Sequence, residues 1–250
     1  MNKHSIYKTF QEAFLGNIEK IINQPEFKTT SRIGNVYEIS SMTYEVEEIS
    51  SFVFKNESIG RLTYDYADTF YRWMMNGCTD SEEILDKYPN ISKFMEKPKS
   101  KDLPENFNTF YGPRILEQLP MVKAELIRNP DTRRAVISII YKDDLNLLDK
   151  DESLEFPCTD SATFFIRDGK LNCHLHMRSQ NMGQVIKLDM YLWGRFTCEL
   201  AKELKLDPGK FSCSIVSAHV FERDFDYLQS LFERKTKLGN AYLLTKYLNL

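Results

Sequence analysis

The chain has 250 residues, of which 42% are hydrophobic and 28% charged, and its formal net charge is −3. This length is enough to bury the core of one large domain or two small ones. The slightly negative balance argues against a general nucleic-acid surface, although it leaves room for a local basic site that holds one phosphate. No apolar run is long enough to cross a membrane, and the N-terminal residues lack a secretory apolar core. We therefore expect neither a nucleic-acid nor a membrane partner.

The five cysteines favour a cytoplasmic protein. They are odd in number, include no Cys-x-x-Cys pair, and mostly lie within apolar patterns. Proteins of the cytosol usually keep such thiols reduced. The sequence therefore predicts free thiols, a cytoplasmic location and no metal centre.

The first half of the chain predicts two helices around a strand region. Apolar residues at helical spacing predict an amphipathic helix over 5–23, and a second helix over 64–76. The segment 32–54 between them is rich in Val, Ile, Tyr, Thr and Ser, which predicts one or two strands. Residues 78–108 are polar, rich in Lys and broken by prolines, so we expect a variable surface insertion there.

The second half of the chain alternates helical and strand patterns. The predicted elements are a helix that stops at Asn129-Pro130, a strand over 135–141, a helix over 185–204, a turn over 207–209, a strand over 211–220 and a helix over 224–235.

A hairpin is predicted within residues 156–189, because Asp168-Gly169 is a strong turn signal between two strand patterns. Strict alternation on the second strand predicts one apolar and one polar face. The apolar set is Leu171, Cys173, Leu175 and Met177, and the polar set is Asn172, His174, His176 and Arg178. This hairpin would bring the thiol of Cys158 and the guanidinium of Arg178 to one rim, which suits an anionic, electrophilic substrate.

Several short motifs occur along the chain at wide intervals: Arg32-Ile33-Gly34, Tyr111-Gly112, Asn129 to Arg134, Pro157-Cys158, Arg178-Ser179 and Ser217-Ala218-His219. Their order resembles that of the thymidylate synthase and deoxycytidylate hydroxymethylase family, over roughly residues 30 to 225. The resemblance implies an α+β fold in a single domain over residues 1–250. It implies a thymidylate synthase-like mixed, twisted β-sheet with packed helices, and a homodimer joined sheet to sheet.

The resemblance also implies functional roles. Cys158 is the expected nucleophile, which adds to carbon 6 of a pyrimidine so that carbon 5 can react. Tyr111 is expected to assist proton removal from carbon 5, and Asp189 to read the base. The expected binding residues are Arg32, Arg178 and Ser179 for the phosphate, Arg133 and Arg134 for the partner subunit's phosphate, and Asn181 and His219 for the base and sugar.

Taken singly, these residues have plainer interpretations. Tyr111 beside a turn glycine is commonly a packing residue, and an Asp in the first turn of a helix commonly compensates the helix dipole. Arg133 and Arg134 also read as surface cations that flank a strand. Arg32 also reads as part of an ordinary charged loop.

Asp189 carries the expectation about the base. It lies eleven residues after Arg178. In the family that the chain resembles, thymidylate synthases have Asn at this position and deoxycytidylate hydroxymethylases have Asp. Cytosine offers an acceptor at N3 and donors on its amino group, so a protonated carboxyl complements it by donating to N3 and accepting from the amine. Asp189 therefore favours cytosine over uracil.

Phe70 is the largest departure from the family pattern. It occupies the position of the family's catalytic Glu, which relays protons and organises water, and a phenyl ring does neither. Three interpretations stay open: Asp68 or another carboxylate substitutes, the register differs, or the chemistry is altered or lost.

The resemblance, together with Asp189, implies a hydroxymethyltransferase that acts on carbon 5 of a pyrimidine nucleoside monophosphate and prefers cytidylate, either dCMP or CMP. The resemblance implies methylenetetrahydrofolate as the one-carbon donor. The alternatives are a thymidylate synthase-type dUMP methyltransferase and a nucleotide-binding relative without turnover.

Overall fold

The computed structural model describes residues 3–31, 33–53, 64–78, 84, 111–148 and 156–231. The elements in chain order are β1 (His4–Tyr7), α1 (Phe10–Asn23), β2 (Phe27–Ser31), β3 (Gly34–Val46), η1 (Ile49–Phe52), α2 (Tyr64–Met75), α4 (Tyr111–Arg128), β4 (Val136–Ser138), η3 (Lys142–Leu147), β5 (Thr159–Arg167), β6 (Lys170–Asn181), α5 (Ile186–Glu203), β7 (Asp207–Phe221) and η4 (Glu222–Asp224).

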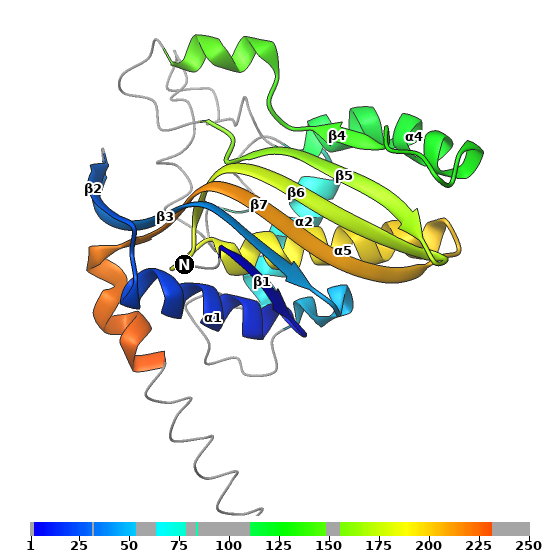
Figure 1. Ribbon diagram of the computed structural model, residues 1–250. Coiled ribbons are helices and arrows are strands. Elements are labelled where there is room, and N and C mark those ends of the chain that lie inside the picture. Colours follow the sequence, from blue (N-terminus) through cyan, green and yellow to red (C-terminus); the bar gives the residue numbers. More distant parts are fainter. Residues whose placement is uncertain are drawn as a thin grey trace, which may run out of the picture.

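The strands form one twisted, mixed sheet (Figure 1) in the order β1-β3-β7-β6-β5-β4, with β2 paired to β3. The β1–β3 and β6–β7 pairs are parallel, and the other pairs are antiparallel. The predicted hairpin between β5 and β6 is confirmed, and both turn residues, Asp168 and Gly169, have the positive φ of a tight hairpin turn. The predicted α+β class is therefore confirmed, whereas the sheet-to-sheet homodimer stays a prediction.

Helices α1 and α5 cover one face of the sheet, and α2 lies alongside α5 (Figure 1). Aromatic side chains fill this layer: the rings of Phe10 and Phe211 are 5.0 Å apart, and those of Phe164 and Phe196 are 5.6 Å apart. Burial of such large apolar groups is the main stabilising contribution to the fold. Among the described residues, no helix is long and apolar enough to span a membrane.

Three predicted boundaries are wrong. The predicted helix over 5–23 begins only at Phe10, because Thr9 caps it by accepting a hydrogen bond from the Glu12 amide, and the residues before it pair with β3 as β1. The strand predicted over 135–141 is shortened to β4, because the amides of Ile139 and Ile140 both bond the Asp160 carbonyl oxygen and the regular pairing with β5 ends at Ser138. The turn predicted at 207–209 is the start of β7, because Asp207 pairs with Lys170.

The surface insertion and the single domain are not tested by the described residues and stay predictions. Within the predicted insertion over 78–108, the structure describes only Cys78 and Ile84, and the rest of the insertion lies outside the described residues. The single domain over residues 1–250 also stays a prediction.

A shared irregularity interrupts the three central strands. The step between successive buried side chains lengthens from two residues to three, from Ile39 to Met42 in β3, from Met177 to Gln180 in β6 and from Ile215 to Ala218 in β7. The flanking residues stay in register across β3, β7 and β6, in the two sets Met42–Ile215–Met177 and Ile39–Ala218–Gln180. Two residues lie within each of these steps, and one of the two is left out of the strand pairing. The residues left out are Ser41, Arg178 and Val216, which we call the kink row; Ser41 has φ of 52°.

The kink row reverses the face that the end of β6 presents to the core. Before it, Leu171, Cys173, Leu175 and Met177 are buried, as the alternation predicts. Within it, Arg178 stays exposed on the outer side, and after it Gln180 is turned inward and buried. Strict alternation therefore holds only up to the kink row.

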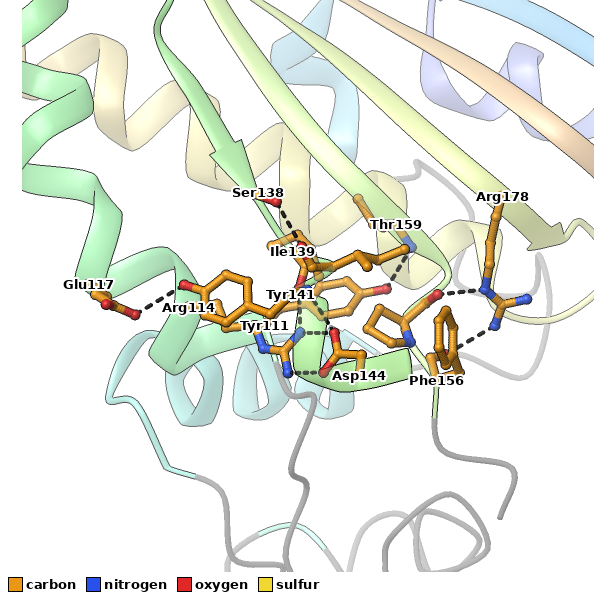
Figure 2. Close-up of polar contacts among 12 residues, drawn as sticks. Tyr111, Arg114, Glu117, Ser138, Ile139, Tyr141, Asp144, Phe156, Thr159 and Arg178 are labelled. Atoms are coloured by element: carbon orange, nitrogen blue, oxygen red, sulfur yellow. Dashed lines mark hydrogen bonds and ion pairs between the residues drawn. The ribbon is translucent and has the colours of Figure 1, made fainter. Parts of the chain in front are cut away.

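A buried ion pair anchors the start of α4 (Figure 2). The guanidinium of Arg114 donates two hydrogen bonds to the carboxylate of Asp144, with N–O distances of 2.6 and 2.7 Å, and a third to the Ile139 carbonyl oxygen. The Tyr141 amide donates to the same carboxylate at 2.8 Å. Because both partners are nearly inaccessible to water, the pair ties α4 to η3 and to the end of β4.

We expect Arg114→Ala to lower the free energy of unfolding by roughly 3 to 5 kcal/mol, because it leaves the buried Asp144 carboxylate unpaired. Urea denaturation at pH 7 measures the change. The matched control is Arg167→Ala, which removes an exposed arginine of β5. Equal effects of the two substitutions would contradict the anchoring role.

Candidate active site

The predicted site residues gather mainly at one end of the sheet. The parallel strands β6 and β7 both finish at this end, and the antiparallel β5 begins there. Helix α5 also starts there, since only a short turn separates it from β6. Topology therefore brings together residues that are far apart in the sequence: Tyr111, Cys158, Arg178, Ser179, Asn181, Asp189 and His219.

Cys158 lies immediately before β5, beside the exposed end of β6. Arg178 donates its backbone amide to the Cys158 carbonyl oxygen at 3.0 Å, and its Nη2 is 3.9 Å from the Cys158 sulfur. The Arg178 guanidinium also bonds the carbonyl oxygens of Pro157 and Phe156, at 2.7 and 3.1 Å, so it is held in place (Figure 2). The predicted meeting of thiol and guanidinium is therefore present.

The electrostatic surroundings of Cys158 keep the thiol protonated in this state. Burial raises the pKa of the Cys158 thiol, and Arg178 opposes that effect without overcoming it. Asp189 and Asp160 raise the pKa further. The thiolate that nucleophilic addition requires therefore needs more positive charge nearby than Arg178 provides in one chain.

Tyr111, at the start of α4, lies next to the nucleophile. Its hydroxyl oxygen accepts a hydrogen bond from the backbone amide of Thr159 at 3.1 Å. Gly112 allows α4 to approach α2 closely, since a Cβ there would overlap the Met74 carbonyl oxygen. Burial raises the pKa of the Tyr111 phenol, and negative charge on Cys158 or Asp189 would raise it further. The phenol is therefore neutral at physiological pH.

Asp189 lies in the first turn of α5 but is only 7% exposed, which a simple dipole-compensating residue would not be. One of its carboxyl oxygens, Oδ2, is 3.4 Å from Nε2 of Gln180. Burial raises the pKa of this carboxyl to about 7, although the Gln180 amide partly opposes the rise. At neutral pH the carboxyl is therefore present in both protonation states.

Asn181 and His219 occupy paired positions at the ends of β6 and β7. Asn181 Oδ1 accepts hydrogen bonds from the amides of Gly183 and Gln184, at 3.1 and 3.2 Å, so it shapes the turn that leads into α5. His219 stacks edge-on against Phe221, and burial lowers its pKa, so its imidazole is neutral. Ser179 lies between Arg178 and Gln180 and pairs with Ser217 of β7.

Arg32 lies outside the described residues, but its neighbours are placed. Arg223 donates to the Ile33 carbonyl oxygen at 2.7 Å, and Ser31 Oγ donates to the Gly34 carbonyl oxygen at 2.8 Å. Val36 of β3 pairs with Phe221 of β7, so this loop borders the end of the sheet that carries His219.

Arg133 and Arg134 lie at the opposite end of β5 from Cys158. The Phe164 amide bonds the Ala135 carbonyl oxygen at 2.8 Å, and the six residue steps from Cys158 to Phe164 span about 20 Å of strand. Arg134 is also paired with Glu125, at 2.9 Å, while Arg133 is exposed. Both arginines lie too far from Arg178 to bind the same phosphate within one chain.

Phe70 belongs to the apolar stripe of α2, and its ring contacts those of Tyr66 and Trp73 at 5.9 and 5.4 Å. Asp68, one of the carboxylates considered in place of the family's Glu, is ion-paired with Arg72 and Arg195. Arg195 is the main cause that lowers the pKa of Asp68, so this carboxylate is a poor proton relay. The carboxyl that interacts with both Cys158 and Tyr111 is Asp189.

Sequence reasoning missed two buried polar residues beside Asp189. Gln180 is 1% exposed, and Tyr44 of β3 is fully buried with Asp189 among the groups that raise its pKa. Tyr44 fits the strand pattern as an ordinary apolar residue, and Gln180 is on the wrong face by strict alternation. The described residues contain no cluster of three or more His, Cys, Asp or Glu that could hold a metal ion.

The fold and the site define an α+β protein with a thiol, a guanidinium and a buried carboxyl at the carboxyl ends of parallel strands. A family model described as thymidylate synthase matches residues 40–246. This match covers most of the chain, which therefore belongs to the thymidylate synthase family.

Curated relatives agree with this assignment. The chain is 32% identical over 128 residues to the bifunctional dihydrofolate reductase-thymidylate synthase of Daucus carota, covering 51% of this chain and 23% of that protein. It is 30% identical over 137 residues to the thymidylate synthase of Herpesvirus ateles, covering 55% of this chain and 44% of that protein. For the thymidylate synthase of Mycoplasma pneumoniae the identity is 30% over 122 residues, covering 49% and 41%. The chain thus spans less than half the length of each of these relatives.

We expect Asp189→Asn to stabilise the free protein at pH 8 by roughly 2 to 4 kcal/mol and to have little effect at pH 4. The folded pKa of Asp189 is about 7, above that of an unfolded Asp, so below pH 4, where both states are protonated, its ionisation adds no cost to folding. The cost grows as pH rises from about 4 to 7, while only the unfolded carboxyl ionises, and then stays constant.

Urea denaturation of both proteins across pH 4 to 8 measures this difference, and the pH 4 pair is the internal control. A constant offset at all pH values would show that Asp189 does not titrate near pH 7 in the folded protein.

Proposed function

We propose that this protein transfers a one-carbon unit to carbon 5 of a pyrimidine nucleoside monophosphate, through a covalent adduct with Cys158. The observation that carries the proposal is the grouping of the Cys158 thiol, the Arg178 guanidinium 3.9 Å away and the buried carboxyl of Asp189. These groups match three parts of such a substrate: the electrophilic carbon 6, the phosphate, and the polar edge of the base.

In this proposal, the substrate phosphate binds Arg178, which lies beside the nucleophilic sulfur of Cys158. Arg178 is fixed by two backbone carbonyl oxygens and keeps a guanidinium exposed beside the sulfur. Arg32, Arg178 and Ser179 are the phosphate-binding residues of this proposal. Further arginines gathered by the same phosphate would lower the pKa of the thiol, which burial raises in the free protein.

Tyr111 is assigned to the proton at carbon 5. Its hydroxyl oxygen is bonded to the amide next to Cys158, and its pKa is raised by burial, so the neutral phenol acts through its oxygen rather than as a phenolate. Asp189 interacts electrostatically with both Tyr111 and Cys158, so it is the available carboxyl for proton relay where Phe70 replaces Glu.

Members of this family use methylenetetrahydrofolate, which would supply the one-carbon unit. The residues present fit such a donor in one respect: a reactive one-carbon unit needs surroundings with little water. Asp189 and Trp193, which lie beside Tyr111, are only 7% and 2% exposed.

The observations support two different substrates, dUMP and a cytidylate. The names of the relatives support the thymidylate synthase-type alternative, methylation of dUMP, better than hydroxymethylation of a cytidylate. Asp189 supports cytidylate, because a carboxyl with a pKa of about 7 is readily protonated and can donate to N3 of cytosine while accepting from its amine. Asn181 and His219 complete the proposed contacts to the base and the sugar.

We further propose a homodimer in which Arg133 and Arg134 serve the partner's site. Two observations support it: these arginines lie about 20 Å of strand from Cys158 in their own chain, and the outer face of the sheet carries paired polar side chains. His174 bonds Ser212 at 2.7 Å and Ser217 bonds Glu38 at 2.9 Å on this face, where Val216 is 53% exposed.

The proposed reaction is tested by release of tritium from carbon-5-labelled dCMP, CMP and dUMP, with and without methylenetetrahydrofolate. We expect release from one of the three and none from Cys158→Ala, because the adduct at carbon 6 is required to labilise the carbon 5 proton. The labelled nucleotide that reacts identifies the base and the sugar. Binding without release by the wild-type protein would favour the relative that lacks turnover.

The shared site is tested by mixing two inactive variants, Cys158→Ala and the double variant Arg133→Ala/Arg134→Ala. If the arginines act across the dimer, each mixed dimer has one intact site, so random exchange of subunits restores about a quarter of wild-type activity. If they act within their own chain, mixing restores nothing. Each variant incubated alone is the control.

A further inference from the structure

Gln180 is a buried polar residue that lies beside Asp189 and has no role in the chemistry proposed above. It follows the kink row in β6 and pairs with Ala218 of β7, which in turn pairs with Ile39 of β3. Both of these neighbours, Ala218 and Ile39, are apolar and buried. An amide among them loses hydrogen bonds to water, so its presence calls for a specific partner.

The partner is Asp189. Gln180 Nε2 donates to Asp189 Oδ2 at 3.4 Å, and the Gln180 side chain also lies close enough to the Tyr44 phenol to lower its pKa, which burial raises. The Gln180 carbonyl oxygen has no hydrogen-bond partner among the described residues. The backbone around both residues is held firmly, because Asn181 caps the intervening turn and Gln184 donates to Asp224 at 2.7 and 2.8 Å. The contact is therefore set by the turn that connects β6 to α5.

This contact makes the two oxygens of Asp189 different. The carbonyl oxygen of a neutral carboxyl accepts a hydrogen bond better than its hydroxyl oxygen does, so the amide N–H on Oδ2 favours the proton on Oδ1. Oδ2 keeps a second lone pair for another donor. A carboxyl arranged in this way offers one donor and one acceptor side by side.

The other groups around Asp189 do not compete for this proton. The titratable neighbours are Tyr111 of α4, Cys158 before β5, Tyr44 of β3 and Cys213 of β7, and burial raises the pKa of each of them. All four are thus neutral at physiological pH. Lys187, on α5 itself, has its pKa lowered to about 8 by burial.

We propose that Gln180 is a positioning residue that holds the proton of Asp189 on Oδ1 and thereby helps the site prefer an aminopyrimidine over an oxopyrimidine. The inference rests on the proposed function, since it requires Asp189 to face the base. Cytosine meets the arranged carboxyl with N3 toward Oδ1 and its amine toward Oδ2, whereas uracil presents a donor to a donor at N3.

The test compares wild-type protein with Gln180→Leu, which keeps the size of the side chain and removes its amide. Calorimetric titration with dCMP and dUMP at pH 6 and pH 8 gives the ratio of the two affinities. We expect roughly tenfold weaker binding of dCMP by the variant and little change for dUMP. In an Asp189→Asn background, Gln180→Leu should leave the ratio unchanged.

A second readout separates positioning from packing. Because the Gln180 amide lowers the pKa of Asp189, Gln180→Leu should move the pH dependence of unfolding that arises from Asp189 to higher pH. The matched control is Thr197→Val, which removes a buried hydroxyl bonded to the Trp193 carbonyl oxygen and should move neither the pH dependence nor the affinity ratio.

The outcomes are separable. If wild-type protein binds dCMP but Gln180→Leu shows the same affinity ratio and the same pH dependence, the role of Gln180 is wrong and the proposed function stands. If wild-type protein binds neither nucleotide, the proposed function itself is wrong, and the role in base selection is overturned with it.

Discussion

The kink row of Ser41, Arg178 and Val216 is the constraint on which the site depends. A strand with unbroken alternation would place Arg178 and Gln180 on the same face, either both in the core or both outside. Because the step between buried residues lengthens here, Arg178 stays outside beside the Cys158 sulfur while Gln180 enters the core beside Asp189. The irregularity persists because neighbouring strands share it and stay in register.

Burial of Asp189 lowers the stability of the fold at neutral pH but raises the pKa of a carboxyl in the site. A carboxyl in the first turn of an exposed helix would be ionised and mildly stabilising. Here the aromatic layer around α5 removes water, and the pKa of the carboxyl rises to about 7. The protein thereby keeps at neutral pH a group that both donates and accepts hydrogen bonds, as buried acids at functional sites commonly do.

The hairpin and the helices followed from local patterns that the structure confirms. Asp168-Gly169 has the turn geometry that its residue types favour, and α2 and α5 lie close to their predicted ranges. The errors arose where long-range pairing overrides local preference. Residues His4–Tyr7 follow the same helical spacing as α1, yet they form a strand because they pair with the edge of β3. Asp207 lies in a sequence typical of a turn, yet it belongs to β7 because it pairs with Lys170 of β6.

The order of the motifs could be read from the sequence, and the resemblance that this order carries implied the α+β class and pointed to Cys158, Arg178 and Asp189, because side-chain chemistry and spacing along the chain are visible without a structure. Tertiary structure alone decided that Asp189 is buried, that Gln180 contacts it, and that Arg133 and Arg134 lie at the far end of β5. These properties depend on which strands are neighbours and where their pleat is interrupted. Such features arise from contacts between distant segments, and no local pattern of residues specifies them.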